Sequence, residues 1–163
     1  MTTLLVLSDP AAPHLKHLER LPQDIHVIVT DKLEQIRERA GEADIILNCI
    51  HKGDMLAAAI ASTQKARWLH SLYTGVEGVH TPGVVASPLP LSNGRGVFRV
   101  SLGEWTIGAM LHFAYHHRTL IRQQDAGVWK WFDTETLQGK TFGVIGYGGI
   151  GSAAAERAWR PVR

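Results

Sequence analysis

Three glycines near the end of the sequence have the spacing of a loop that binds the phosphates of a nucleotide. Gly146, Gly148 and Gly151 form the pattern G-x-G-x-x-G, directly after the apolar run TFGVI and directly before the helix-forming run SAAAERA. Such a loop needs glycine for a tight turn, for close approach of the backbone to a pyrophosphate and for close packing of helix on strand. The helix that follows presents unpaired N–H groups to the phosphates. We therefore predict a dinucleotide-binding turn, with a purely structural glycine turn as the alternative.

The full motif also includes an acidic residue about 20 residues further on, which holds the ribose hydroxyls. The final residues WRPVR contain no strand pattern, and Pro161 is expected to end the helix after the glycine loop. These residues therefore do not distinguish NAD from NADP.

Several histidines have positions that could suit a metal or a ligand. His112 and His116 are four residues apart, a spacing that can place two imidazoles on one metal ion. The residues between them lack the glutamate of a zinc protease, and no third ligand is evident, so we predict no metal site. His51 follows an apolar run and is expected at the carboxyl edge of a sheet, where ligands tend to bind. A solvated loop histidine is the alternative.

The composition indicates a globular protein in a reducing compartment. Of the 163 residues 45% are hydrophobic and 20% are charged, and the formal net charge is +2. Because Lys and Arg are scattered, we expect neither nucleic acid nor a membrane as a partner. The single cysteine, Cys49, lies in the apolar run ADIILNCI, which excludes an internal disulfide. The opening MTTLLVLSDP has no basic leader, so we expect a cytoplasmic location.

The first hundred residues alternate short apolar runs with helix-like segments, which is typical of βαβ units and a parallel sheet. Strands are expected at TLLVLSD, DIHVIVTD, ADIILNCI, RWLHSLYTG and SPLPLSNG. The last belongs at an edge, because Pro88 and Pro90 cannot donate to a sheet ladder. Helices are expected at PAAPHLKHLERL, where Leu15, Leu18 and Leu21 share a face, at KLEQIRERAGEA and at GDMLAAAIAST. The predicted fold class is therefore α/β.

A longer helix is expected to begin at Ser101. The run SLGEWTIGAMLHFAYHHRTLIRQQDAGVW has Ser101 and Glu104 at capping-box spacing and continues without proline to Gly127. Its first half is apolar nearly all round, so we expect this helix to lie between two domains. The predicted organisation is a sheet domain at 1–100, the interdomain helix at 101–131 and, at 132–163, the start of a second domain that opens with the strand TFGVI.

Three segments together resemble the D-isomer-specific 2-hydroxyacid dehydrogenases. They are RWLHSLYTGVEGV, SNGRGVFRVSLGEWTIGAMLHFAYHHR and LQGKTFGVIGYGGIGSAAAERA, in the order in which family members show them. The resemblance extends to about Ala158. It implies a flavodoxin-like substrate domain and a Rossmann cofactor domain joined by long helices, with the active site between them. It further implies a homodimeric oxidoreductase that uses NAD or NADP to reduce small 2-oxo acids such as glyoxylate or hydroxypyruvate.

The resemblance also implies which residues bind each ligand. The backbone N–H groups of Thr74, Gly75 and Val76 would hold the substrate carboxylate, as an anion nest after a strand can do. An ordinary strand-end turn is the alternative. The loop for the cofactor pyrophosphate would consist of Gly146, Gly148, Gly149, Ile150 and Gly151.

The catalytic part of the family pattern has no match in these residues. The family uses an arginine to polarise the substrate carbonyl and a histidine paired with a glutamate as acid and base, and no histidine here lies in the matching motif. Glu104 is interpreted as a helix cap. We therefore predict no catalytic residue, and our leading hypothesis is the amino-terminal half of such an enzyme, truncated after the glycine loop and inactive alone. The alternative is a non-catalytic binding or self-association module that exposes an apolar helix face.

Overall fold

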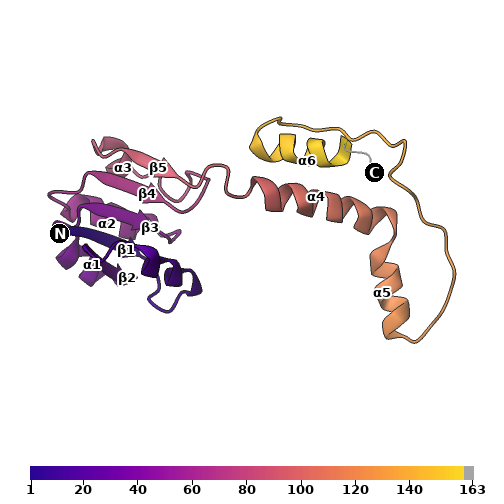
Figure 1. Ribbon diagram of the computed structural model, residues 1–163, viewed down its shortest axis with the longest axis horizontal. Coiled ribbons are helices and arrows are strands. Elements are labelled where there is room, and N and C mark those ends of the chain that lie inside the picture. The colour runs from indigo at the N-terminus through magenta and orange to yellow at the C-terminus, as the bar shows by residue number, and fades with distance from the viewer. Residues whose placement is uncertain (160–163) are drawn as a thin grey trace. The chain divides into compact units, whose positions relative to one another are not determined.

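The computed structural model describes residues 1–159, and the chain divides into two compact units, Met1–Arg95 and Gly96–Arg163 (Figure 1). The predicted effect of Pro161 lies outside the described residues. Within residues 1–159, none of the helices combines the length and the apolar character that crossing a bilayer requires.

The first unit is built on a five-stranded parallel sheet. Its strands are β1 (Thr2–Leu7), β2 (Ile25–Thr30), β3 (Ile45–Asn48), β4 (Trp68–Ser71) and β5 (Leu91–Asn93), in the order β2-β1-β3-β4-β5. Each neighbouring pair is parallel. This is the flavodoxin-like order of a doubly wound sheet. The predicted α/β fold class is confirmed, and β5 lies at an edge, as Pro88 and Pro90 predicted.

Apolar side chains cover both faces of this sheet, which explains the continuous hydrophobic runs of its strands. The connecting helices are η1 (Pro13–Arg20), α1 (Leu33–Arg39), η2 (Ala40–Glu42), α2 (Gly53–Ser62) and α3 (Pro82–Ala86). On one face, Leu5 and Ile46 of the sheet belong to a buried cluster with Ile36 of α1 and Leu56 of α2. On the other face, Leu4 and Val6 form a smaller cluster with Cys49, against which the leucines in and after η1 pack.

The segment around Leu15 is a helix, as predicted, and it is of the 3₁₀ type. Residues Pro13–Arg20 form a 3₁₀ helix, and Leu15, Leu18 and Leu21 pack against the cluster of Leu4 and Val6. A 3₁₀ helix has three residues per turn, so side chains three positions apart lie directly above one another. The strict three-residue spacing of the leucines therefore suits this tighter helix better than an α-helix.

Cys49 is buried at the end of β3, and this makes its thiol unreactive. Burial raises the pKa of Cys49 to about 11. At pH 8 only roughly one thiol in a thousand would then be ionised, and the thiolate is the form that alkylating reagents attack. We expect iodoacetamide to modify native Cys49 at least tenfold more slowly than the same residue in the urea-unfolded chain, as followed by mass spectrometry. Equal rates would show that the thiol is accessible.

Asp44 links the starts of β1 and β3 and should make the first unit sensitive to acid. The backbone N–H of Thr3 donates to Asp44 Oδ2 at 2.8 Å, and this bond, with a smaller effect of Lys65, lowers the pKa of Asp44 below its ordinary value of 3.8. A lowered pKa adds stability that is fully present above the unfolded-state value and is lost as the pH falls through the folded-state value.

We therefore expect Asp44→Asn to flatten the fall in stability below about pH 4, measured as the urea midpoint at a series of pH values. Asp24→Asn, in an exposed turn, is the matched control. An unchanged pH dependence in Asp44→Asn would contradict the assignment.

The second unit contains three helices, α4 (Arg99–Ala114), α5 (His117–Asp125) and α6 (Gly149–Trp159), of which α6 lies alongside α4 (Figure 1). The prediction of one long helix from Ser101 to Gly127 is therefore wrong. His116 has a φ of 49°, in the left-handed region, and separates α4 from α5. The carbonyl of Ala114 accepts a hydrogen bond from the N–H of Glu135 at 3.0 Å, so a distant segment takes the acceptor that a continuous helix would use.

The predicted capping box is also wrong. Helix α4 begins at Arg99, with Phe98 in the cap position, so Ser101 and Glu104 lie inside the helix. The hydroxyl of Ser101 donates to the carbonyl of Phe98 instead of capping a turn. Glu104 lies 3.8 Å from the guanidinium of Arg157 on α6, measured from Oε1 to Nη2.

The predicted strand TFGVI is not a strand in the second unit. Residues 141–145 have no regular secondary structure, and Ile145 is fully exposed. A parallel strand needs a neighbour to complete its hydrogen-bond ladder. Within the described part of the second unit there is no other strand, so the β-branched residues of this segment have no partner to pair with.

Candidate functional site

The parallel strands of the first unit bring three loops to one edge of the sheet. Because β3, β4 and β5 run in the same direction, the residues after Asn48, Ser71 and Asn93 all leave the sheet at its carboxyl edge. In open α/β sheets this edge is the usual place for ligands. The loop after β4 contains the predicted substrate-binding residues.

The N–H groups of Thr74, Gly75 and Val76 are free to bind an anion. Within residues 1–159, none of these three groups donates a hydrogen bond to another part of the chain. Where the backbone turns so that consecutive unpaired N–H groups converge, they form a positively polarised concavity that would suit a carboxylate. We define these three residues as the substrate loop.

Hydrogen bonds to β5 hold the substrate loop in place. The Asn93 side-chain amide donates to the carbonyl of Thr74 at 2.8 Å, and the Thr74 hydroxyl donates to the carbonyl of Gly94 at 2.9 Å. The N–H of Gly94 donates to the carbonyl of Tyr73 at 3.2 Å. Gly94 is buried, and a Cβ atom at this position would overlap the carbonyl oxygen of Leu72. Only glycine therefore allows the end of β5 to approach Leu72, just before the substrate loop, this closely.

Two further side chains lie next to the substrate loop. The carboxylate of Glu77 lies against Gly75, so it places a negative charge beside the proposed anion site. On the other side, the imidazole of His51 stacks on the ring of Tyr73, with ring centroids 3.5 Å apart and an interplanar angle of 31°. The Tyr73 hydroxyl donates to the carbonyl of Cys49 at 2.8 Å, which fixes this stacked pair to the end of β3. His51 is thus at the carboxyl edge, as expected.

The glycine loop of the second unit has the backbone geometry that its sequence predicted. Gly146 has a φ of 87°, and a Cβ atom at Gly151 would overlap the carbonyl oxygen of Gly146. By contrast, a Cβ atom at Gly148 or Gly149 would meet nothing within 4 Å. Gly146 and Gly151 are therefore required for the turn itself, whereas Gly148 leaves its surface open to a ligand.

The N-terminus of α6 completes the predicted pyrophosphate loop. Helix α6 begins at Gly149, so the first N–H groups of Gly149, Ile150 and Gly151 lack helical partners. The hydroxyl of Ser152 bonds to the carbonyl of Gly149 at 3.2 Å. Unpaired N–H groups and the positive end of the helix dipole favour a phosphate here. That these five residues bind the cofactor remains a prediction.

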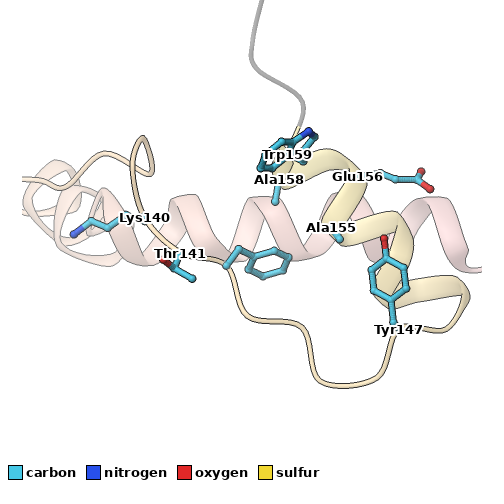
Figure 2. A pocket seen from close by; sticks show the side chains of 8 residues that line it. Lys140, Thr141, Tyr147, Ala155, Glu156, Ala158 and Trp159 are labelled. Carbon is cyan, nitrogen blue, oxygen red and sulfur yellow. The ribbon is translucent and has the colours of Figure 1, made fainter.

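The second unit also contains a cavity of about 590 Å³, but it is not the predicted cofactor site. Figure 2 shows side chains from α6 and from the segment before the glycine loop around it. The lining residues are Lys140, Thr141, Phe142, Tyr147, Ala155, Glu156, Ala158 and Trp159. None of the five predicted pyrophosphate residues is among them. The cavity lies beside Phe142 and the second half of α6, and from the glycine loop only Tyr147 lines it.

The structure does not bring His112 and His116 together. The break at His116 ends the helical register on which their four-residue spacing depended. The ring of His112 instead lies edge-on to that of His117, with centroids 5.7 Å apart. Within the described residues there is no group of three or more side chains of His, Cys, Asp or Glu that could hold a metal ion.

Sequence reasoning missed Asn93 and Gly94, the residues that hold the substrate loop from β5. Their signal was available, because Asn93 ends β5 and Gly94 follows it, at the same sheet edge as the substrate loop. Tyr73 was missed in the same way, although it directly precedes Thr74. Aligning the carboxyl ends of the two expected strands would have indicated that Tyr73, Asn93 and Gly94 lie beside the substrate loop.

The fold and the two loops define a class of protein: an α/β chain with a flavodoxin-like sheet, a loop with three unpaired N–H groups at its carboxyl edge and a glycine loop of the G-x-G-x-x-G type in a second unit. The comparisons with known proteins name the family. The model of the D-isomer specific 2-hydroxyacid dehydrogenase NAD binding domain matches residues 107–160. The resemblance to the D-isomer-specific 2-hydroxyacid dehydrogenases is confirmed, and the domain model that matches is of the NAD-binding type.

Two curated relatives are each 26% identical to this chain. A hydroxypyruvate reductase of Blautia hydrogenotrophica aligns over 134 residues, which are 77% of this chain and 41% of the relative. A D-3-phosphoglycerate dehydrogenase of Methanocaldococcus jannaschii aligns over 161 residues, which are 97% of this chain and 30% of the relative. The chain therefore spans less than half the length of the curated relatives it matches.

Solved structures show the same fold over nearly the whole chain. A D-isomer specific 2-hydroxyacid dehydrogenase family protein of Aeromonas salmonicida has a TM-score of 0.74 at 24% identity, and 96% of this chain covers 50% of that one. An NADPH-dependent glyoxylate/hydroxypyruvate reductase of Sinorhizobium meliloti has a TM-score of 0.75 at 20% identity, with the same coverage. At these identities the structures establish the fold alone.

Proposed function

We propose that this chain forms the substrate-binding part, and the first turn of the cofactor-binding part, of an NAD(P)-dependent 2-hydroxyacid dehydrogenase. The observation that carries this proposal is the row of three free N–H groups at Thr74, Gly75 and Val76 on the carboxyl edge of the sheet. The hydroxypyruvate reductase and the phosphoglycerate dehydrogenase among the relatives support small 2-oxo and 2-hydroxy acids as the substrate class. The proposed domains are a substrate-type domain at 1–100, an interdomain segment at 101–131, which contains α5 and most of α4, and the start of the cofactor domain at 132–163.

The role of the substrate loop follows from the charge of a 2-oxo acid. Its carboxylate would accept hydrogen bonds from the three N–H groups, each of the charge-assisted kind that contributes about 1.5–3 kcal/mol. Bound in this way, the acid has a fixed orientation and presents its carbonyl carbon away from the loop. Gly148 and the N-terminus of α6 would hold the pyrophosphate of the cofactor, NAD or NADP. In its reduced form the bound cofactor would supply the hydride.

We also propose that a polypeptide of these 163 residues binds substrate but does not turn it over. The resemblance implies an arginine and a histidine–glutamate pair for the chemistry, and the sequence offers no match for them. Mixing the purified polypeptide with NADH and glyoxylate or hydroxypyruvate should therefore give no loss of NADH absorbance, with the Blautia reductase as the positive control. Turnover at the usual enzyme rates of about 1–1,000 per second would contradict this proposal.

Glu77 offers a direct test of the anion site. Its carboxylate lies against Gly75, so it should repel the carboxylate of a bound 2-oxo acid. Two unit charges about 4 Å apart in water interact by about 1 kcal/mol, which corresponds to roughly a fivefold change in affinity. We expect Glu77→Gln to bind glyoxylate about fivefold more tightly at low salt, measured by calorimetry.

The matched control is Glu38→Gln, which removes the same charge from the exposed surface of α1. Glu38→Gln should leave the affinity for glyoxylate unchanged. Equal affinities of the Glu77 variant and the native chain would show that the substrate loop does not bind the carboxylate of glyoxylate.

A second candidate function is self-association through the second unit. Four aromatic side chains there are largely exposed, with exposed fractions of 70% for Trp105, 74% for Phe113, 96% for Trp129 and 77% for Trp131. Apolar surface of this kind drives association, and it supports a homodimer as the proposed assembly. Sedimentation velocity tests this: a monomer at all concentrations that also excludes apolar dyes would count against it.

The buried, free Cys49 supports a cytoplasmic location.

A further inference from the structure

Two polar side chains are fully buried under the loops of the carboxyl edge without a hydrogen-bond partner. Asn48 and Ser71 both have an exposed fraction of 0%. Within residues 1–159, Asn48 Oδ1, Asn48 Nδ2 and Ser71 Oγ form no hydrogen bond. By contrast, the buried hydroxyl of Thr30 in β2 donates to the side-chain oxygen of Gln35 at 2.6 Å.

The two side chains lie next to each other on the same face of the sheet. Asn48 and Ser71 are partners in the register of β3 and β4, and they are the last residues of these strands. Two positions earlier, Ile46 and Leu69 are also partners, and both belong to the larger apolar cluster. Because side chains two residues apart share a face, Asn48 and Ser71 form the polar end of this buried layer.

Burying Asn48 and Ser71 destabilises the folded chain unless their polar atoms find hydrogen-bond partners. A buried polar group without a partner costs about 1–3 kcal/mol, and Asn48 and Ser71 together present three such atoms. Water can satisfy all three, because it both donates and accepts and needs only two to four polar partners in a buried site. We propose that Asn48 and Ser71 bind one buried water molecule, which bridges the carboxyl ends of β3 and β4.

This water would support the loops that carry the candidate site. The N–H of Leu72 donates to the carbonyl of Asn48 at 2.9 Å, and Tyr73 reaches back to the carbonyl of Cys49. The bridging water adds a side-chain link directly beneath these two backbone bonds. It thereby holds the start of the segment from Leu72 to Thr74 at a fixed distance from the end of β3. The proposal does not depend on the function of the substrate loop.

The direct test is magnetisation transfer from water to the Asn48 side-chain amide in the ¹⁵N-labelled chain. A long-lived bound water gives NOE and ROE cross-peaks of opposite sign to both Nδ2 protons, and we expect this for native protein. We expect the cross-peaks to disappear in Ser71→Ala. No cross-peaks in the native chain, or cross-peaks that survive Ser71→Ala unchanged, would overturn the proposal.

A double-mutant cycle gives an independent measurement. If the water is bound, Ser71→Ala and Asn48→Leu each lower the urea midpoint, and the double variant loses less than the sum, since the second change removes a group that is already unpaired. If nothing bridges the pair, each change removes an unsatisfied polar group, so each raises the midpoint and the two effects add. That second pattern would overturn the proposal. Thr30→Val is the control: it breaks the bond to Gln35 and lowers the midpoint, but it should leave the Asn48 cross-peaks in place.

Discussion

Gly94→Ala is expected to destabilise the first unit by about 1–3 kcal/mol, the usual cost of overpacking a buried site. Gly94 is buried after β5, and a Cβ atom there would overlap the carbonyl oxygen of Leu72. That atom belongs to the backbone and cannot rotate away, so β4 and β5 must separate at their carboxyl ends. The separation would also strain the bonds from Asn93 and Thr74 that hold the substrate loop. We expect a lower urea midpoint together with weaker binding of glyoxylate.

Gly83→Ala provides the matched control in the same unit. Gly83 lies in α3, where a Cβ atom would meet nothing within 4 Å. Alanine is favoured over glycine in a helix by about 0.5–1 kcal/mol, so this change should be neutral or slightly stabilising. If Gly94→Ala and Gly83→Ala had the same midpoint, the close approach at Leu72 would be of no structural importance.

Gly151→Ala should have an effect of similar size in the second unit. A Cβ atom at Gly151 would overlap the carbonyl oxygen of Gly146 and come within 3.1 Å of Val144 Cγ1. The start of α6 must then move away from the glycine turn, at a cost of about 1–3 kcal/mol. We expect the amides of Ala153 and Ala154, which are buried on α6, to lose about tenfold or more in hydrogen-exchange protection.

Gly148→Ala should leave the hydrogen-exchange protection of Ala153 and Ala154 within about twofold of native. A Cβ atom at Gly148 would meet no neighbour, and exposed substitutions of this kind usually change stability by less than about 0.5 kcal/mol. The two variants therefore separate the glycine that the turn requires from the glycine that a ligand requires. Similar protection in both would mean that the spacing of the motif does not reflect packing of α6 on the turn.

The fold of the first unit could be predicted because its signals are local. Short apolar runs alternate with helical segments, and the two prolines before Leu91 restrict the last strand to an edge. Helix type was harder to predict, since the leucines of residues 13–21 fit both an α-helix and a 3₁₀ helix. The break at His116 was not predictable from local pattern. It coincides with a hydrogen bond between Ala114 and Glu135, residues 21 positions apart in sequence.

The candidate site was predictable only in part, for a related reason. The glycine spacing gave the conformation of Gly146 and Gly151, because a positive φ and a close contact both exclude other residues. The substrate loop was predicted from family resemblance, whereas the bonds that position it connect β4 to β5. Such cross-strand bonds have no signature in either segment alone. Asn48 and Ser71 show the same limit, since two polar residues in apolar runs become a pair only through strand register.

The most direct test of the central claim is a titration of the ¹⁵N-labelled chain with glyoxylate, followed through the backbone amides. We expect the N–H resonances of Thr74, Gly75 and Val76 to shift together and saturate, with the resonance of Gly83 on α3 as an unaffected reference. Binding of the carboxylate by the substrate loop would be contradicted if the shifts were confined to other parts of the chain. It would also be contradicted if these three amides did not shift at up to about 100 mM glyoxylate, since a dissociation constant of that size corresponds to only about 1.4 kcal/mol of binding free energy.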